Sequence, residues 1–339
     1  FTNKAAREMR KRVQQSMPGN GVSARGLTIS TFHSLGMRIL NRHLEAAGLT
    51  TGYSIIDPTD ALNVIGDFLA RKSGRNPDLA ERITYAISRW KNDGLSPTSH
   101  ELPATNPAEL AAQTIYPEYD RYLRACNSVD LDDLIFLPTR LLRDHGDIRK
   151  TWREKIRYLL IDEYQDTNGA QYDMVKLLVG DGSHLTVVGD DDQSIYSWRG
   201  ARPENLVRLQ EDFPNLAVVK LEQNYRSMGR ILAVANHLIA SNPRPFEKRL
   251  WCEKGYGDAV RIVPAKNDDT EAEKVVSAIM TRQFQSNCQH RDFAILYRSN
   301  HQARVLETKL REMRIPYRLS GGMSFFDRSE VRDAMAYIR

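Results

Sequence analysis

The sequence predicts an α/β protein with two parallel-sheet domains and a helical insertion in the first of them. Short apolar runs alternate with segments of helical periodicity, which is the pattern of a parallel sheet. One long stretch, residues 34–143, shows only helical periodicity. The strand pattern then restarts after Asn224, which indicates a second α/β domain.

The first domain is expected to begin with a basic helix at residues 3–15 and a short strand at 26–29. Its other strands are expected at 156–161, 185–188 and 217–221, where each apolar run lies between helical segments. Strand ends in such sheets are where sites form, so the residues that follow each run are the first candidates for a site.

The stretch at 34–143 is predicted to be a helical insertion. Apolar residues recur there three or four positions apart, for example at Leu62, Ile65 and Leu69. Turn residues at 94–97 break the pattern between two helices.

The second domain is predicted to combine a helix at 231–239 with strands at 259–263, 293–297 and 317–319. The proline-containing segment 242–245 is expected to be a connecting loop.

Composition bounds the classes of protein that the chain can belong to. A chain of 339 residues with 41% hydrophobic content can bury two or three cores. No window approaches the roughly 18 apolar residues that span a bilayer, so we expect a soluble, cytoplasmic protein without a membrane partner. The net charge of +5 permits a polyanionic partner. We expect reduced, buried thiols rather than zinc or disulfides at the widely spaced Cys126, Cys252 and Cys288.

Two adjacent carboxylates, Asp162 and Glu163, follow the apolar run at 158–161. One acid can hold Mg²⁺ on nucleotide phosphates while its neighbour polarises an attacking water, as phosphoryl transfer requires. The simpler alternative is a solvated loop after a buried strand. A solvated loop accounts for Asp162 and Glu163 but does not also account for Gln165 and Asp166.

A second polar segment follows the run at 185–188. Gln193 can sense a γ-phosphate, while Tyr196, Trp198 and Arg199 offer faces on which unpaired bases stack. A core and salt-bridge cluster is the simpler alternative. The position just after a phosphate-type loop favours the functional interpretation.

Tyr225 and Arg226 lie where the two α/β domains meet. Tyr225 could stack on an adenine, and Arg226 could supply the positive charge of an arginine finger. A surface salt bridge is the alternative for this pair.

Taken in order, these segments resemble the superfamily-one DNA helicases of the Rep/UvrD/PcrA group. The resemblance covers nearly the whole chain, and the Asp-Glu-Tyr-Gln-Asp and Gly-Asp-Asp-Asp-Gln blocks are its most specific parts. The matching segments are 1–6, 31–34, 162–166, 189–201, 223–227, 294–300 and 320–326.

The resemblance implies ATP and Mg²⁺ as cofactors. It places Mg²⁺ on Asp162, water activation on Glu163, γ-phosphate sensing on Gln193 and Arg226, and adenine stacking on Tyr225. The implied partners are single-stranded DNA and forked duplex DNA, with movement in the 3′ to 5′ direction. The DNA contacts would come from Phe1, Thr2, Asn3, Thr31, His33, Tyr196, Trp198, Arg199 and Asn300. His33 has a rival interpretation as a core histidine.

The resemblance also implies RecA-like motor domains with the family's subdomain order. The first motor domain (1A) would comprise 1–33 and 144–222, and the helical insertion (1B) 34–143. The second motor domain (2A) would comprise 223–322, and 323–339 would begin a further inserted domain (2B).

The chain contains no G-x-x-x-x-G-K-[ST] loop, the main phosphate anchor of the family. We therefore expect a fragment of a longer protein that binds nucleotide poorly and is inactive alone. Two alternatives stay open. One is a subunit of a helicase-nuclease, which would need an additional cluster of nuclease carboxylates. The other, for the fragment itself, is a non-enzymatic module that binds single-stranded DNA.

Overall fold

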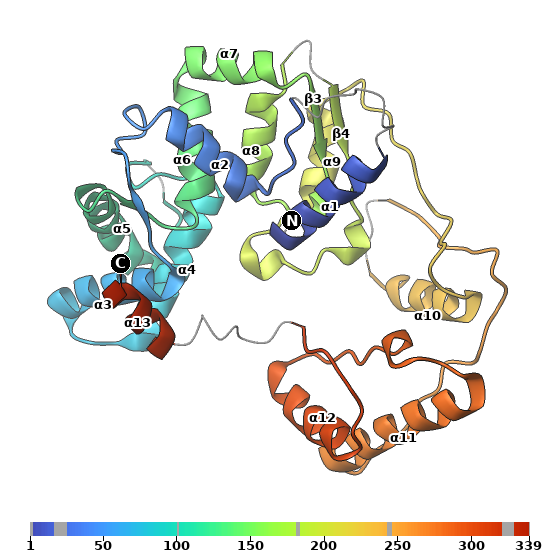
Figure 1. Cartoon of the computed structure of the whole chain (residues 1–339). Helices are drawn as coiled ribbons and strands as arrows, with labels where there is room; N and C mark the ends of the chain where they lie inside the picture. The colour runs from blue at the N-terminus through green and yellow to red at the C-terminus, as the bar shows by residue number, and fades with distance from the viewer. Residues whose placement is uncertain are drawn as a thin grey trace. The chain divides into compact units, whose positions relative to one another are not determined.

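The computed structural model describes residues 3–16, 26–99, 102–180, 184–242, 246–320 and 329–338 (Figure 1). The chain divides into two compact units. The first consists of Phe1–Arg226 and Leu232–Glu253, and the second of Ser227–Ile231 and Lys254–Arg339. Helices combined with short parallel strands confirm the mixed α/β class.

The first unit contains the strands and most of the helices. Its strands are β1 (Ser54–Ile55), β2 (Ser128–Val129), β3 (Tyr158–Ile161) and β4 (His184–Val187). Its helices are α1 (Asn3–Ser16), α2 (Phe32–Arg42), α3 (Pro58–Ser73), α4 (Pro77–Asn92), α5 (Pro107–Ala125), α6 (Asp133–Asp144), α7 (Gly146–Lys155), α8 (Gly169–Leu178), α9 (Glu204–Asp212) and most of α10 (Gly229–Ile239).

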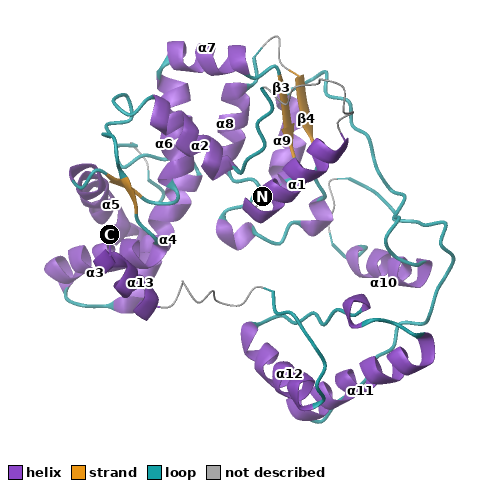
Figure 2. Cartoon of the chain, in the orientation of Figure 1, coloured by secondary structure: helices purple, strands orange, loops and turns teal. Residues whose placement is uncertain are grey.

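The strands β3 and β4 pair in parallel, with Ile161 opposite Val187, and lie side by side in Figures 1 and 2. This confirms the predicted parallel arrangement of the runs at 156–161 and 185–188. A second parallel pair, β1 with β2, was not predicted. Strands of two residues are too short to carry a period-two pattern.

The other expected strands are wrong as paired strands. The segments 26–29, 217–221, 259–263, 293–297 and 317–319 are loops in Figure 2 and carry no ladder among the residues described. An apolar run favours extended backbone, but a strand also requires a neighbour that accepts and donates its hydrogen bonds. Such a neighbour is a property of the tertiary structure.

Helices fill most of the stretch where helical periodicity was predicted, and α3, α4 and α5 begin where an Asp or Asn precedes a proline. The side chains of Asp57, Asn76 and Asn106 each accept a backbone N–H of the first turn. Proline suits the next position because it has no N–H to leave unpaired. Buried residues between these helices form one core: Ile65, Leu69, Ile83, Ile87, Trp90, Ile115, Tyr116, Tyr119 and Leu123.

A second core lies where α6 packs against α2 and α8. The approach of α2 to α6 is close enough to require glycine. A Cβ on Gly36 would lie 1.7 Å from the Leu134 carbonyl oxygen. The buried side chains of this core include Ile39, Leu40, Leu137, Leu142, Trp152 and Met174.

A third core holds the loops that follow β3 and β4. It consists of Ile161, Tyr164, Tyr172, Val175 and Leu209, contributed by β3, α8, α9 and the short 3-10 helix at Tyr164–Asp166. Tyr164 and Tyr172 are fully buried, so the backbone around them is firmly placed.

The second unit contains α11 (Asp268–Ser286), α12 (Asn300–Glu312) and α13 (Ser329–Ile338). The first two of these helices pack together through a small core of Val276, Ile279, Leu310 and Ile315.

The structure bears on two expectations drawn from composition. Within the described ranges, no helix has the length and apolar character needed to cross a bilayer. None of the three cysteines, all within the described ranges, forms a disulfide; Cys126 is exposed and the other two are half-buried, so the expected burial was wrong.

Candidate functional site

Two polar loops leave β3 and β4 at the same edge of the sheet. The Val188 N–H donates to the Ile161 carbonyl at 2.8 Å, and the Tyr164 N–H donates back to the Val188 carbonyl at 2.9 Å. Parallel pairing therefore continues past the ends of the strands. It brings the Asp162–Asp166 loop beside the loop that begins at Gly189.

Asp162 and Glu163 form the first part of the site. Asp162 is exposed, and its carboxylate accepts the Glu163 N–H at 3.1 Å. Glu163 has left-handed backbone angles, φ 55° and ψ 46°. A residue other than glycine adopts this conformation at a cost of about 1–2 kcal/mol, and such strain concentrates at functional sites. The left-handed turn directs the Glu163 side chain differently from a residue in a regular strand.

Asp166 adds a third carboxylate. Among the residues described, its Oδ1 atom is buried without a hydrogen-bond partner. Burial, with a contribution from the nearby Glu163 carboxylate, raises the pKa of Asp166. The unpartnered Asp166 oxygen near the Glu163 carboxylate fits a divalent cation such as Mg²⁺, which prefers oxygen ligands.

Gln165 joins the two loops. Its side chain is buried, with 1% of the residue exposed. The Nε2 atom donates to Glu163 Oε2 at 2.8 Å, and Oε1 accepts the Asp190 N–H at 2.9 Å. Gly189 permits this contact, since a Cβ there would lie 3.0 Å from Gln165 Oε1.

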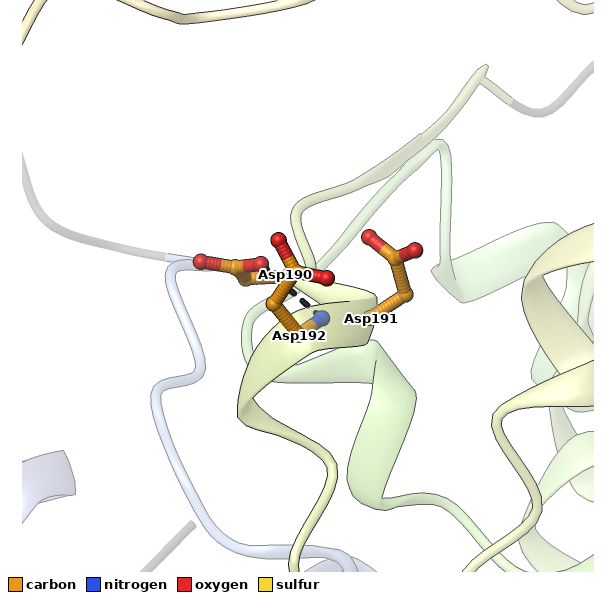
Figure 3. Close-up of side chains that lie close together, drawn as sticks. All are labelled: Asp190, Asp191 and Asp192. Atoms are coloured by element: carbon orange, nitrogen blue, oxygen red, sulfur yellow. Dashed lines mark hydrogen bonds between the residues drawn. The ribbon is translucent and has the colours of Figure 1, made fainter. Parts of the chain in front are cut away.

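Three consecutive aspartates, Asp190, Asp191 and Asp192, lie in the second loop with ligand atoms within 4.8 Å of one another (Figure 3). Such a cluster could hold a metal ion. In this structure, however, the Lys248 ammonium pairs with all three carboxylates, at 3.3 Å in the case of Asp192. The charge that a cation would neutralise is thus met by Lys248.

The ion pairs explain the titration of these groups. Burial alone would raise the pKa of Asp190, but hydrogen bonds from Lys248 and Gln193 outweigh it, and the pKa is lowered. Burial would lower the pKa of Lys248, yet its bonds to Asp190 and Asp191 raise the pKa above its usual value. Both groups are therefore charged near neutral pH.

Gln193, the predicted γ-phosphate sensor, is exposed and hydrogen-bonds to the same cluster. Its Nε2 atom donates to Asp190 Oδ2 at 2.7 Å. Glu163 and Gln193 are thus connected through Gln165 and Asp190, although Gln193 follows Glu163 by 30 positions in the sequence.

The predicted base-stacking residues come just after Gln193 in the same loop. Tyr196 and Trp198 have ring centroids 6.4 Å apart, and Trp198 is 58% exposed. An indole this exposed does not fit the alternative of a core cluster. Arg199 lies in the 3-10 helix Ser197–Arg199, and its side chain lies outside the described part of the structure.

A buried polar network holds the end of this loop. The Arg202 N–H and the Asn205 side chain both donate to the Thr167 carbonyl, at 2.9 and 3.0 Å. Asn168 caps α8 and donates to the Asn92 side chain of α4 at 2.6 Å. The helical insertion and both loops of the site are therefore joined by direct hydrogen bonds.

Only some of the remaining predicted DNA contacts lie in the described part of the chain. Phe1 and Thr2 lie outside the described residues, as does the side chain of Asn300, which begins α12. Thr31 is buried, and its hydroxyl caps α2. The Ser34 hydroxyl connects Thr31 to Asn3. The Thr31 hydroxyl donates to it at 3.0 Å, and it donates to the Asn3 side-chain oxygen at 3.4 Å.

His33 is exposed, so the alternative of a core histidine is wrong. The protein atoms around the ring still desolvate it enough to lower its pKa.

Tyr225 and Arg226 are exposed and belong to the first compact unit. The Tyr225 hydroxyl donates to Gln223 Oε1 at 2.6 Å, and the Arg226 N–H donates to the Asn224 side chain at 3.0 Å. Tyr225 is 73% exposed, so its ring is accessible to a planar ligand.

Sequence reasoning assigned no role to Gln165, Asp190 or Lys248. Three successive aspartates do signal that a cation is needed. No local pattern identifies that cation as Lys248, which follows Asp190 by 58 positions.

The chain matches two family models over nearly its whole length. Residues 1–214 match the UvrD/REP helicase N-terminal domain, and residues 219–339 match the UvrD-like helicase C-terminal domain.

Curated relatives agree with these matches. Over 339 residues the chain is 51% identical to the ATP-dependent DNA helicase Rep of Escherichia coli K12 and 50% identical to that of Salmonella typhimurium LT2, covering all of this chain and 50% of each relative. It is 40% identical to the ATP-dependent DNA helicase PcrA of Staphylococcus aureus Mu50, covering all of this chain and 46% of that protein. The chain thus spans about half the length of these relatives. The matched models and the joined loops after β3 and β4 lead to one conclusion: the chain belongs to the UvrD/REP helicase family.

Proposed function

We propose that this chain is the core of an ATP-dependent DNA helicase that moves 3′ to 5′ along single-stranded DNA and unwinds forked duplexes in replication restart or repair, in the cytoplasm. The observation that carries the proposal is the connection of the two loops. Through Gln165, the acidic pair after β3 is joined to the segment that carries Gln193 and the exposed Trp198.

The proposed reaction is hydrolysis of the γ-phosphate of ATP. Glu163 accepts a proton from water as the water oxygen bonds to the γ-phosphorus, and the bond from that phosphorus to the bridging oxygen of ADP breaks. Gln193 orients the γ-phosphate, and Arg226 stabilises its developing negative charge. Tyr225 stacks on the adenine. Mg²⁺ held by Asp162 would neutralise charge on the phosphate oxygens.

Coupling to DNA follows from the position of the aromatic residues. Tyr196 and Trp198 lie three and five positions after Gln193, on the same loop. A change in the γ-phosphate contact of Gln193 therefore shifts the surface on which bases stack. Repeated closing and opening would pass bases from one pocket to the next, with Asn3, Thr31, His33, Arg199 and Asn300 lining the channel.

The domain assignment is part of the same proposal. RecA-like domains 1A (1–33 and 144–222) and 2A (223–322) would flank the ATP cleft, with 1B (34–143) inserted in the first and 2B beginning at 323. The pairing of β3 with β4 and the helices of the insertion support the first of these domains.

We propose further that residues 1–339 bind single-stranded DNA but are inactive as an ATPase, because their sequence contains no phosphate-binding loop. The test is fluorescence anisotropy of labelled single- and double-stranded oligonucleotides, titrated with the chain across a salt series, with and without ATP–Mg²⁺. We expect preferential, salt-sensitive binding to single strands and no response to nucleotide. Absence of binding would contradict the assignment of the DNA surface.

The catalytic assignment is tested in the full-length protein with Glu163→Gln. Removing the base should preserve ATP binding and abolish turnover, because the amide cannot take the proton of water. Binding is measured with a fluorescent ATP analogue and turnover by phosphate release. A normal turnover rate would remove Glu163 from the role of base.

A further inference from the structure

A continuous series of hydrogen bonds runs from Glu163 to Lys248. Glu163 accepts from Gln165 at 2.8 Å, and Gln165 accepts the Asp190 N–H at 2.9 Å. Asp190 Oδ2 accepts from Gln193 at 2.7 Å, while its Oδ1 accepts from Lys248. We call this series the Gln165 relay.

The amide of Gln165 has one permitted orientation in the relay. With Nε2 facing the Glu163 carboxylate and Oε1 facing the Asp190 N–H, both contacts pair a donor with an acceptor. If Oε1 and Nε2 exchanged places, the amide oxygen would face the Glu163 carboxylate and the amide N–H groups would face the Asp190 N–H. Since 1% of Gln165 is exposed, water cannot relieve that conflict. Gln165 therefore holds the Glu163 carboxylate and the Asp190 backbone in a fixed mutual geometry.

Asp190 divides its carboxylate between two partners. One oxygen accepts from Gln193 and the other from Lys248. The ammonium also pairs with Asp191, whose side chain is 6% exposed. A displaced Lys248 would leave close carboxylates to repel each other, and Asp190 would turn away from Gln193. The orientation of Gln193 is thus tied to Lys248.

The Lys248 end of the relay is attached to the strand-like segment before Tyr225. The Arg249 N–H donates to Glu222 Oε1 at 2.7 Å, and the Trp251 N–H donates to the Glu222 carbonyl at 3.1 Å. The Asn224 N–H donates to the Trp251 carbonyl at 2.7 Å. The relay therefore ends on the backbone that immediately precedes Tyr225 and Arg226.

We propose that Gln165 is a positioning residue for the helicase reaction, and that the relay from Glu163 to Lys248 keeps the general base, Gln193 and the Tyr225–Arg226 segment in a common geometry. This inference rests on the proposed function, because it assigns a purpose to contacts between groups that act on ATP there. A water-activating carboxylate misplaced by about 1 Å loses on the order of 100-fold in rate.

The test uses the full-length protein and separates positioning from binding. Gln165→Met keeps the volume of the side chain and removes both hydrogen bonds, and Gln165→Asn keeps the amide but is one methylene too short to span the loops. For each variant, kcat and KM for ATP, the Kd of a fluorescent ATP analogue and Tm are measured. We expect kcat to fall about 10- to 100-fold, with KM and Kd changed by less than about threefold.

Lys248 provides the second arm. Lys248→Met should lower kcat, and Lys248→Arg should restore most of it by keeping the positive charge. Gln165→Met/Lys248→Met should be no slower than the slower single variant, because both changes interrupt the same relay. The matched control is Lys220→Met, which removes a lysine that donates to the Glu247 carbonyl of the same segment at 2.6 Å and should leave kcat unchanged.

The outcomes distinguish failure of the relay from failure of the proposed function. Normal kcat in Gln165→Met, beside an inactive Glu163→Gln, would overturn the relay alone. Normal turnover in Glu163→Gln would overturn the proposed base. Parallel losses of kcat, nucleotide affinity and Tm in both Gln165 variants, or multiplicative losses in the double variant, would reduce Gln165 to a structural residue and also overturn the relay.

Discussion

Replacement of Lys91 by methionine should destabilise the helical insertion strongly. The Lys91 side chain is fully buried, and its ammonium lies 2.6 Å from Asp130 and 2.8 Å from Asp133, whose side chains are 11% and 0% exposed. Burial would lower the pKa of Lys91, but the two carboxylates outweigh it and raise the pKa well above its usual value. The lysine is therefore charged near neutral pH.

The magnitude follows from the charges left behind. Arg124 lies 2.7 Å from Asp133 and compensates one carboxylate, while Asp130 keeps only hydrogen bonds, among them one from Tyr119 at 2.9 Å. Leaving a buried carboxylate without its cation costs about 3–5 kcal/mol. Because the methionine replaces most of the apolar stem, cavity formation adds little to this figure.

Urea unfolding of the chain, followed by tryptophan fluorescence to which the buried Trp90 contributes, measures the loss. The control is Lys72→Met, whose partner Glu118 lies 2.6 Å away in a pair that is 39% and 32% exposed. That pair should contribute less than about 1 kcal/mol. A loss below about 1 kcal/mol for Lys91→Met, or equal losses for both variants, would refute the argument that burial of the cluster decides the difference.

Three further outcomes are expected. Trp198→Ala should weaken single-strand binding by about 1–3 kcal/mol in anisotropy titrations, whereas the exposed Tyr85→Ala on α4 should not; equal affinities would assign Trp198 to the scaffold. Gly189→Ala should lower stability by about 1–3 kcal/mol in urea, since its Cβ would press on Gln165 Oε1 at 3.0 Å; unchanged stability would mean that the loop gives way. Burial, then the neighbouring Asp130, raises the pKa of Asp132 to about 6. The folded state therefore holds this proton more tightly than the unfolded state, and stability is lost as pH rises from about 4 through 6. Asp132→Asn should remove about 1–2 kcal/mol of that loss between pH 5 and pH 8, and an unchanged pH dependence would contradict the assignment.

Several elements could be predicted because their causes are local. The Asp-Pro and Asn-Pro pairs at Asp57, Asn76 and Asn106 set the starts of α3, α4 and α5 through hydrogen bonds within one turn. The runs that became β3 and β4 were short, apolar and bounded by polar residues, and their parallel pairing follows from the helix between them. The polar residues that follow these two strands therefore lie at the same edge of the sheet.

Other features depend on partners that local patterns do not identify. The apolar runs at 217–221 and 259–263 resemble strands in composition, but they lack pairing neighbours in the part of the chain that the structure describes. Lys91, on an otherwise regular helix, gives no sequence sign that it meets two aspartates about 40 positions later.

The sequence by itself determined the helices between residues 34 and 143, the order of the polar loops, the residue types available for phosphate and base chemistry, and the resemblance that the family matches confirmed. These depend on spacing along the chain. Only the tertiary structure decided that Gln165 would join the Glu163 and Asp190 loops and that Lys248 would meet the three aspartates. The physical reason is that hydrogen bonds and ion pairs depend on distances between atoms, and packing sets those distances for residues 25 to 58 positions apart.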